Sequence, residues 1–270
     1  MAHKNIFNYS VLPILLLLLA PVMSRASIVV LNGLTHLHDV VPGETYRGVI
    51  EIQNTKDGEQ TVKLYQRDYF FRYTGEAFYE EPGSQDRSNA AWIDISPTYF
   101  VLKAKEKRSV SYEIKVPDDA ELNGTFWSVI MVEGVAPISE NDLKKGLNVR
   151  TQIRYAVQVA TTFNKEGNRN LTFYDVAVVK EDGQTYLAVD IENKGDFLFR
   201  PDVSVEIFNG EGQSLGVFTA VKKKIYPETS ARFLMEIEGI GTGNYQVLVL
   251  ADCGDEDVFG INLPLEITDD

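Results

Sequence analysis

Residues 108–116 read RSVSYEIKV, and this stretch decides the fold class. Every second residue is apolar, and the residues between are polar or charged: Val110, Tyr112, Ile114 and Val116 alternate with Ser109, Ser111, Glu113 and Lys115. A period of two places alternate side chains on opposite faces of an extended strand. The stretch therefore predicts a β-strand with one face in a core and the other in solvent.

The same alternation recurs from Val49 to the C-terminus, in segments rich in Val, Ile, Tyr, Phe and Thr. Turn pairs such as Asp182-Gly183 and Asn209-Gly210 separate these segments. Helix signals are confined to residues 139–146, where a capping serine and a terminal glycine favour one or two helical turns in a loop. The chain is predicted to be all-β.

Two parts of the chain share the same order of segments. Residues 49–54 (VIEIQN) resemble residues 188–193 (AVDIEN), and residues 109–133 resemble residues 230–252. About seven strands in each roughly 100–130-residue half is typical of an immunoglobulin-like β-sandwich. With a short polar linker at 165–170, the sequence predicts two tandem immunoglobulin-like β-sandwich domains, 27–165 and 170–270. The alternative, a shared β-sandwich pattern without duplication, predicts the same architecture.

Residues 1–26 have the composition of a cleaved signal peptide. Lys4 precedes an apolar run over residues 11–23, and Ser24 and Ala26 are the small residues that signal peptidase prefers. The run has 13 residues, fewer than the ~20 that a membrane-spanning helix needs. We predict cleavage after Ala26, export to the periplasm or cell surface, and no transmembrane anchor. An uncleaved anchor is the alternative.

Composition excludes several classes of protein. The 270 residues include 26 Lys and Arg against 39 Asp and Glu, a formal net charge of −13. This balance disfavours the clustered cationic surface that nucleic acids require. The single Cys cannot form an internal disulfide, and the three His offer no zinc-site spacing. We therefore expect no nucleic-acid partner, no cofactor and no metal.

The candidate reactive motifs lack the context that chemistry needs. Residues 212–216 match G-x-S-x-G, but no His follows them and no helix is predicted after them. His36 and His38 share a strand face without a third ligand, which favours a surface or interdomain pair over a metal site. The acids around Gly254 favour a solvated turn over calcium. Residues 222–224 (KKK) are expected at a solvated edge rather than at an anion site.

The aromatic stretch at residues 65–79 (YQRDYFFRYTGEAFY) is the most unusual surface candidate. It gathers seven aromatic side chains around a Thr74-Gly75 turn, beside Arg67 and Arg72. Such clusters are typical of binding surfaces, but alternate residues of a hairpin must also face a core. An interaction face and ordinary packing are left as equal alternatives. Trp92 and Trp127 are expected to pack inside the first domain.

Residues 91–97 (AWIDISP), 100–102 (FVL) and 108–117 (RSVSYEIKVP) resemble the first domain of PapD-like periplasmic pilus-assembly chaperones. Residues 41–54 also resemble WxL-interacting surface proteins. The first resemblance implies an F strand at 126–132, a long loop at 136–147 and a G strand at 149–163. It also implies that the G strand is added to an exported polypeptide, such as a fimbrial subunit, by β-augmentation.

The G strand supplies the predicted partner-binding residues. Those that share its apolar face are Val149, Ile153, Tyr155, Val157 and Val159. The family anchors a partner's terminal carboxylate with an Arg on the first strand and a Lys on the G strand. Residues 27–37 contain neither Arg nor Lys, so Arg154 and then Arg150 are the candidates. The alternative is that the strand alternates only to fill its own core.

The predicted function is a non-catalytic exported binding protein that holds another exported polypeptide through an edge strand or the interdomain cleft. The alternative is a surface adhesion or envelope-associated module that recognises glycan or protein through the aromatic hairpin. An enzyme is the least favoured class, because no group of residues combines a nucleophile, a base and a stabilising donor.

Overall fold

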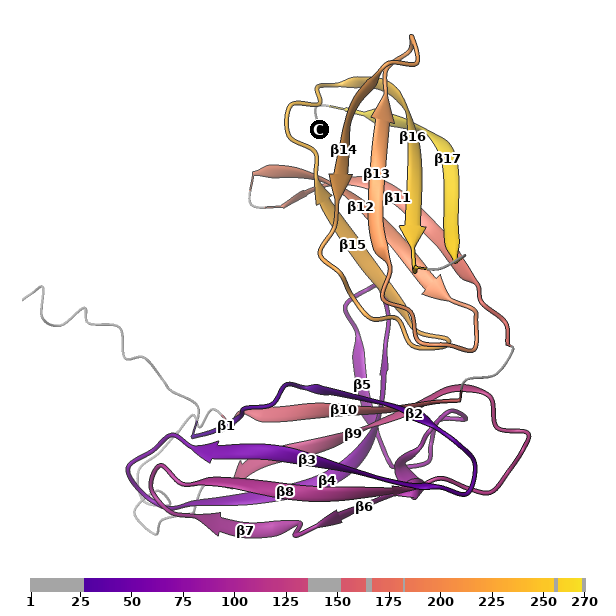
Figure 1. Cartoon of the computed structure of the whole chain (residues 1–270). Coiled ribbons are helices and arrows are strands. Elements are labelled where there is room, and N and C mark those ends of the chain that lie inside the picture. The colour runs from indigo at the N-terminus through magenta and orange to yellow at the C-terminus, as the bar shows by residue number, and fades with distance from the viewer. Residues whose placement is uncertain (1–26, 136–151, 164–166, 182, 255–256, 269–270) are drawn as a thin grey trace, which may run out of the picture.

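The computed structural model describes residues 27–135, 152–163, 167–181, 183–254 and 257–268 (Figure 1). The predicted signal peptide, the helical turn at 139–146, Val149 and Arg150 lie outside the described residues. The regular elements are β-strands, apart from one 3-10 turn, η1, at Ala90–Trp92. No helix in the described part of the chain is long and apolar enough to cross a bilayer.

The first sandwich packs two sheets against each other. The smaller sheet has the strand order β1-β3-β8-β6, with bounds Ile28–Val30, Thr45–Asn54, Lys107–Lys115 and Ile93–Ser96. The larger sheet has the order β2-β10-β9-β4-β5, with bounds Thr35–Val40, Arg154–Phe163, Gly124–Val135, Gln60–Phe71 and Ala77–Glu80. Strand β7, Tyr99–Leu102, pairs with β4. The first described strand, β1, thus lies in one sheet, and the next strand, β2, lies in the other, where it runs parallel to β10.

Residues 108–115 of the stretch RSVSYEIKV lie in β8, and its alternation is confirmed. Val110, Tyr112 and Ile114 point into the core between the two sheets, with at most 2% of their surface exposed. The serines between them face outward. Burying each large apolar side chain stabilises the fold by about 1.5–3 kcal/mol, so this face binds the two sheets together.

Gly48 of β3 provides the room that the ring of Tyr112 occupies. A Cβ atom at Gly48 would lie 2.0 Å from Cζ and 2.1 Å from the hydroxyl oxygen of Tyr112. Gly48→Ala is therefore expected to displace the ring and to lower the free energy of unfolding by roughly 2–4 kcal/mol. The loss combines overpacking with the hydrogen bonds that the Tyr112 hydroxyl makes to two histidine rings. Urea denaturation measures this loss. Gly58→Ala is the matched control, because an added Cβ there meets nothing within 4 Å; equal stability of the two variants would contradict the prediction.

The second sandwich has its own sheets and its own core. One sheet has the order β11-β12-β15, with bounds Leu171–Glu181, Gln184–Asn193 and Ser230–Glu236. The other has the order β14-β13-β16-β17, with bounds Ser214–Thr219, Asp202–Phe208, Gly243–Asp252 and Val258–Ile267. The two principal cores draw their buried residues from 28–163 and from 171–267 respectively. The predicted fold class, all-β with two tandem immunoglobulin-like β-sandwiches, is confirmed.

A small third cluster joins the two sandwiches. Trp127 of β9 and Tyr226 of the second sandwich stack with ring centroids 4.9 Å apart, and Ala160 of β10 is buried beside them. Trp127 was expected in the first core. It instead covers the outer face of the larger sheet, because the second sandwich packs on that face and buries β9 from both sides.

The aromatic stretch forms the β4–β5 hairpin, which reaches from the first sandwich toward the second (Figure 1). Phe71 packs into the junction cluster, and the Tyr73 ring lies 5.9 Å from that of Tyr174 in β11. Arg72 forms an ion pair with Glu192 of β12. The hairpin therefore supports the junction between the sandwiches, and much of its aromatic surface is used in packing.

Candidate functional site

Part of β10 has an open backbone edge. Strand β2 pairs only with residues 158–163 of β10, and the Gln158 N–H donates to the Leu34 carbonyl at 2.9 Å. Backbone groups of alternate residues point to the same side of a strand, so those of Arg154 and Ala156 also point to the β2 side. No strand in the described ranges pairs with them there. This free stretch, Arg154–Val157, is named the open edge.

The predicted partner-binding residues fall into two groups. Val157 and Val159 are 0% exposed and belong to the first core. Tyr155 is partly buried against that core, whereas Ile153 is 39% exposed. We expected all of these side chains to face a partner. Those of Val157 and Val159 are instead enclosed by their own sandwich, because β10 faces the opposite sheet along its whole length.

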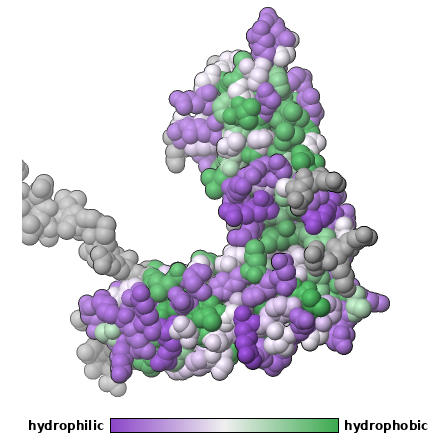
Figure 2. Space-filling view, in the orientation of Figure 1, coloured by the Kyte–Doolittle hydropathy of each residue, from purple (hydrophilic) through white to green (hydrophobic). Residues whose placement is uncertain are grey.

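A cavity of about 480 Å³ lies beside the open edge, where the two sandwiches meet. Residues of β10, among them Arg154 and Gln158, form one wall. Tyr69 and Tyr79 of the hairpin contribute aromatic rings to its lining. The second sandwich contributes Lys223, Lys224 and Tyr226, and the space is open to solvent. Figure 2 shows the molecule hollowed in the corner between its two sandwiches. This cavity is named the cleft.

The cleft is cationic. Lys224 Nζ donates to Thr35 Oγ1 at 3.0 Å, and no carboxylate in the described ranges forms an ion pair with it. Burial, and to a lesser extent the charge of Arg200, lowers the pKa of Lys224. A partly desolvated ammonium without a counter-charge favours a bound anion, because each stabilises the charged form of the other.

Arg154 adds a second cation at the rim of the cleft. Its Nε lies 3.2 Å from Glu133 Oε2, and its side chain remains half exposed. The guanidinium is therefore held beside the open edge while part of it faces solvent. A carboxylate in the cleft would meet positive groups from both sandwiches.

The sequence predicted the β10 side of this site and missed the other side. Residues 222–224 were expected at a solvated edge, but they differ in the structure. Lys222 pairs with Asp202 on the surface, whereas Lys223 and Lys224 line the cleft. The sequence feature that could have indicated this side is the run of three lysines at 222–224, two residues before Tyr226. Only the packing of the second sandwich shows which of these lysines face the cleft.

The other motifs do not assemble a reactive site. Ser214 begins strand β14 instead of a strand-to-helix turn. Asp257 pairs with Arg169 at 2.5 Å, and the neighbouring residues 255–256 lie outside the described residues. No group of three or more metal-ligating side chains occurs among the residues that the structure describes.

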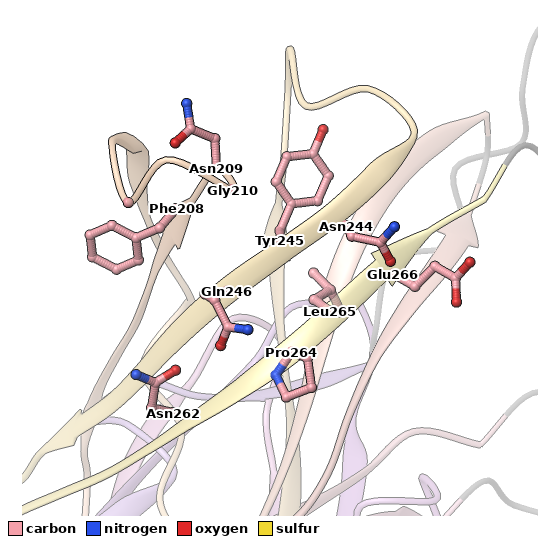
Figure 3. Close-up of a pocket in the computed structure, with 11 residues that line it drawn as sticks. Phe208, Asn209, Gly210, Asn244, Tyr245, Gln246, Asn262, Pro264, Leu265 and Glu266 are labelled. Atoms are coloured by element: carbon pink, nitrogen blue, oxygen red, sulfur yellow. The ribbon is translucent and has the colours of Figure 1, made fainter.

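A larger hollow, about 780 Å³, lies on the outer face of the second sandwich (Figure 3). Phe208, Gln246 and Pro264 form one row across β13, β16 and β17. Asn244 and Asn262 lie on neighbouring rows. The hollow contains none of the residues of the open edge or the cleft, so it is a separate surface.

No protein-family model and no curated protein matches the chain. A solved structure of the class 5 fimbriae chaperone CfaA is 14% identical over 88% of this chain and 100% of its own, with a TM-score of 0.48. The Escherichia coli chaperone DraB is 14% identical over 88% and 98%, with a TM-score of 0.44.

A chain from the complex of the SafA pilin with the SafB chaperone of Salmonella enterica is 13% identical over 88% of this chain and 97% of its own, with a TM-score of 0.46. These similar solved structures are described as fimbrial chaperones or as a complex that contains a chaperone.

Proposed function

We propose that the protein is a non-catalytic, exported, PapD-like binding protein of the periplasm. It holds an extended segment of another exported polypeptide, such as a fimbrial subunit, on the open edge. The partner's terminal carboxylate enters the cleft. The observation that carries this proposal is the open edge lying directly beside a cationic cleft.

The open edge suits an extended peptide because its backbone groups on the β2 side pair with no strand in the described part of the chain. The N–H and C=O of Arg154 and Ala156 would pair with a partner strand, as in β-augmentation. Ile153, which directly precedes the open edge, presents an exposed apolar side chain to that strand. Val157 and Val159 support the edge from within the core and do not contact the partner.

The cleft suits a carboxylate because Lys224 has an ammonium but no ion-pair partner within the described ranges. Lys223 and Arg154 border the same space. A terminal carboxylate bound there would end the added strand at the junction and so set its register. The domain junction therefore contributes to binding through the positive charges of these three side chains.

Removing the cleft cation is expected to weaken capture of the partner. Lys224→Ala should lower the amount of bound polypeptide at least tenfold, since a charge-assisted hydrogen bond contributes about 1.5–3 kcal/mol. The measurement is quantitative mass spectrometry of polypeptides captured from an envelope extract. Lys222→Ala is the matched control, because Lys222 pairs with Asp202 outside the cleft.

A photo-crosslinking amino acid at Ala156 tests the open edge in the same extract. The crosslinker at position 156 should link to the polypeptide whose capture depends on Lys224. The same crosslinker placed at Val217 of β14 should not link to that polypeptide. The proposal fails if Lys224→Ala and Lys222→Ala retain the same polypeptides in equal amounts. It also fails if the links from residues 156 and 217 are identical.

A glycan-binding function has one observation in its favour. Asn244, Gln246 and Asn262 border the hollow of Figure 3, beside the Phe208 ring, and their amides donate to no residue in the described ranges. Amides and an aromatic ring are suited to a neutral saccharide, whose hydroxyls need donors and acceptors. Binding of soluble cell-wall oligosaccharide that is lost in Gln246→Ala and kept in Lys224→Ala would favour this function.

A further inference from the structure

Two histidines of β2 meet one tyrosine of the opposite sheet. His36 Nδ1 lies 2.8 Å and His38 Nε2 lies 3.0 Å from the hydroxyl of Tyr112. The His36 ring stacks on the tyrosine ring at 5.7 Å, and the His38 ring meets it edge-on at 6.0 Å. Tyr112 is 2% exposed. The pair was expected at a surface or between domains, but it lies against the core of the first sandwich.

This cluster ties β2 to the smaller sheet. Strand β2 is only six residues long and lies at the edge of the larger sheet, where β10 is the one described strand that pairs with it. The two histidines give it a second attachment, to β8 through Tyr112. Where β2 is attached to β10, the open edge ends. The position of β2 therefore sets how much of β10 a partner strand can reach.

The hydrogen bonds of the cluster depend on how many protons it holds. A tyrosine hydroxyl has one proton to donate and can accept two hydrogen bonds. With two neutral imidazoles it donates to one ring and accepts from the other. One imidazolium preserves this arrangement, because that ring then only donates. Two imidazolium rings both donate, so the hydroxyl proton loses its acceptor and two like charges share one buried oxygen.

The surroundings of the cluster oppose charge. Burial lowers the pKa of both histidines; His38 lowers that of His36 further, and Asp39 partly offsets the shift of His38. His36 Nε2 is buried and has no hydrogen-bond partner in the described part of the chain, so its proton in a cationic ring would be unsatisfied.

The elements packed around the cluster bring neutral residues to it. The register places Val159 and Thr161 of β10 beside the two histidines, and Gly48 of β3 lies opposite Tyr112. Arg47 and Glu113, the neighbours of Gly48 and Tyr112 along β3 and β8, form an ion pair with each other at 2.9 Å. Asp39 is therefore the one acid that acts directly on the histidines among the described residues.

We propose that His36 and His38 are positioning residues that set the length of the open edge. While they are neutral they hold β2 on β10, and their double protonation releases β2 and extends the open edge from Val157 to Phe163. This regulation rests on the proposed function, because it matters only if a partner strand uses that edge.

The direction of the pH dependence follows from the lowered pKa values. The unfolded chain binds these protons below about pH 6.5, and the folded cluster binds them only at lower pH. Attachment of β2 is therefore complete above the unfolded value and is lost as the pH falls through the folded values. The change is confined to acid conditions.

Hydrogen–deuterium exchange of the full chain tests this release without a partner. Exchange of residues 158–163 is compared at about pH 7.5 and about pH 5, after correction for intrinsic rates, with β16 as an internal reference. In the wild type, protection of the Gln158, Ala160 and Thr162 amides, which point to β2, should fall at least tenfold at the lower pH while β16 keeps its protection. The double variant His36→Gln/His38→Gln should show equal protection at both pH values, because glutamine cannot be protonated.

The single variant His38→Gln provides a second comparison if the double variant does not fold. It leaves one titrating ring, which the hydroxyl accommodates, so its pH response should be much weaker than that of the wild type. An unchanged protection of 158–163 at the lower pH in the wild type overturns the proposal. So does a pH response of the same size in His38→Gln.

The capture assay at about pH 7.5 separates this inference from the proposed function. Dependence of capture on Lys224 with no pH response of 158–163 would overturn only the regulation. A pH response in exchange with no dependence of capture on Lys224 would overturn only the proposed function.

Discussion

Val157→Asp is expected to unfold the first sandwich. Val157 is completely buried and lies opposite Ile130 of β9, within the core that joins the two sheets. A carboxylate at this position would have no counter-charge and few hydrogen-bond partners. The cost of burying it is of the order of several kcal/mol, comparable with the total stability of a domain, about 5–15 kcal/mol. Near-ultraviolet circular dichroism and thermal unfolding measure the loss of the packed core.

Ile153→Asp is the matched control, since it introduces the same carboxylate four residues earlier along the chain. Ile153 is exposed, so its variant should keep the thermal stability of the wild type within about 0.5 kcal/mol. It should lose partner capture if the proposed edge binding is right. A folded Val157→Asp protein with wild-type stability would contradict the burial of Val157 and would return its side chain to the binding surface.

Tyr226→Ala is expected to separate the two sandwiches without unfolding either. The Tyr226 ring is 0% exposed, stacks on Trp127 and meets Phe71 edge-on at 6.3 Å. Its hydroxyl donates to Gln158 Oε1 at 2.9 Å. Truncating a buried aromatic residue costs about 3–5 kcal/mol, and this cost falls on the junction because the ring belongs to neither principal core.

Small-angle X-ray scattering should show a larger radius of gyration for Tyr226→Ala, and calorimetry should resolve separate transitions for the two sandwiches. Tyr226→Phe removes only the hydrogen bond and should cost about 0.5–1.5 kcal/mol while keeping the wild-type shape. An unchanged radius of gyration in Tyr226→Ala would mean that the polar contacts of the junction, such as the Arg87–Asp196 ion pair, hold the domains by themselves.

The two variants probe different parts of the same site. Val157 supports the strand whose edge is open, and Tyr226 holds the wall of the cleft in place beside that edge. If both results are as expected, the site depends on the first core for its strand and on the junction for its cations. Capture of a partner should then be lost in either variant, but for separate reasons.

The alternation in RSVSYEIKV and in the later segments was enough to predict an all-β chain, and the repeated order of those segments was enough to predict two sandwiches. A period of two assigns side chains to faces from local geometry alone, and each sandwich needs one apolar face on each sheet. The resemblance of residues 91–117 to the first domain of PapD-like chaperones likewise needed no coordinates. The same resemblance made Arg154, which lines the cleft, a candidate anchor for a partner's carboxylate.

The tertiary structure decided what covers each face. Alternation places Val157 and Val159 together, but only the opposite sheet shows that their face is enclosed. Similarly, Trp127 is buried by a domain that begins some forty residues later in the chain, and Lys224 reaches the cleft because the second sandwich packs there. The contact of His36 and His38 with Tyr112 also joins two sheets, and only the tertiary structure shows it. The physical reason is that strand periodicity is a property of neighbouring residues, whereas burial and contact depend on surfaces brought together from distant parts of the chain.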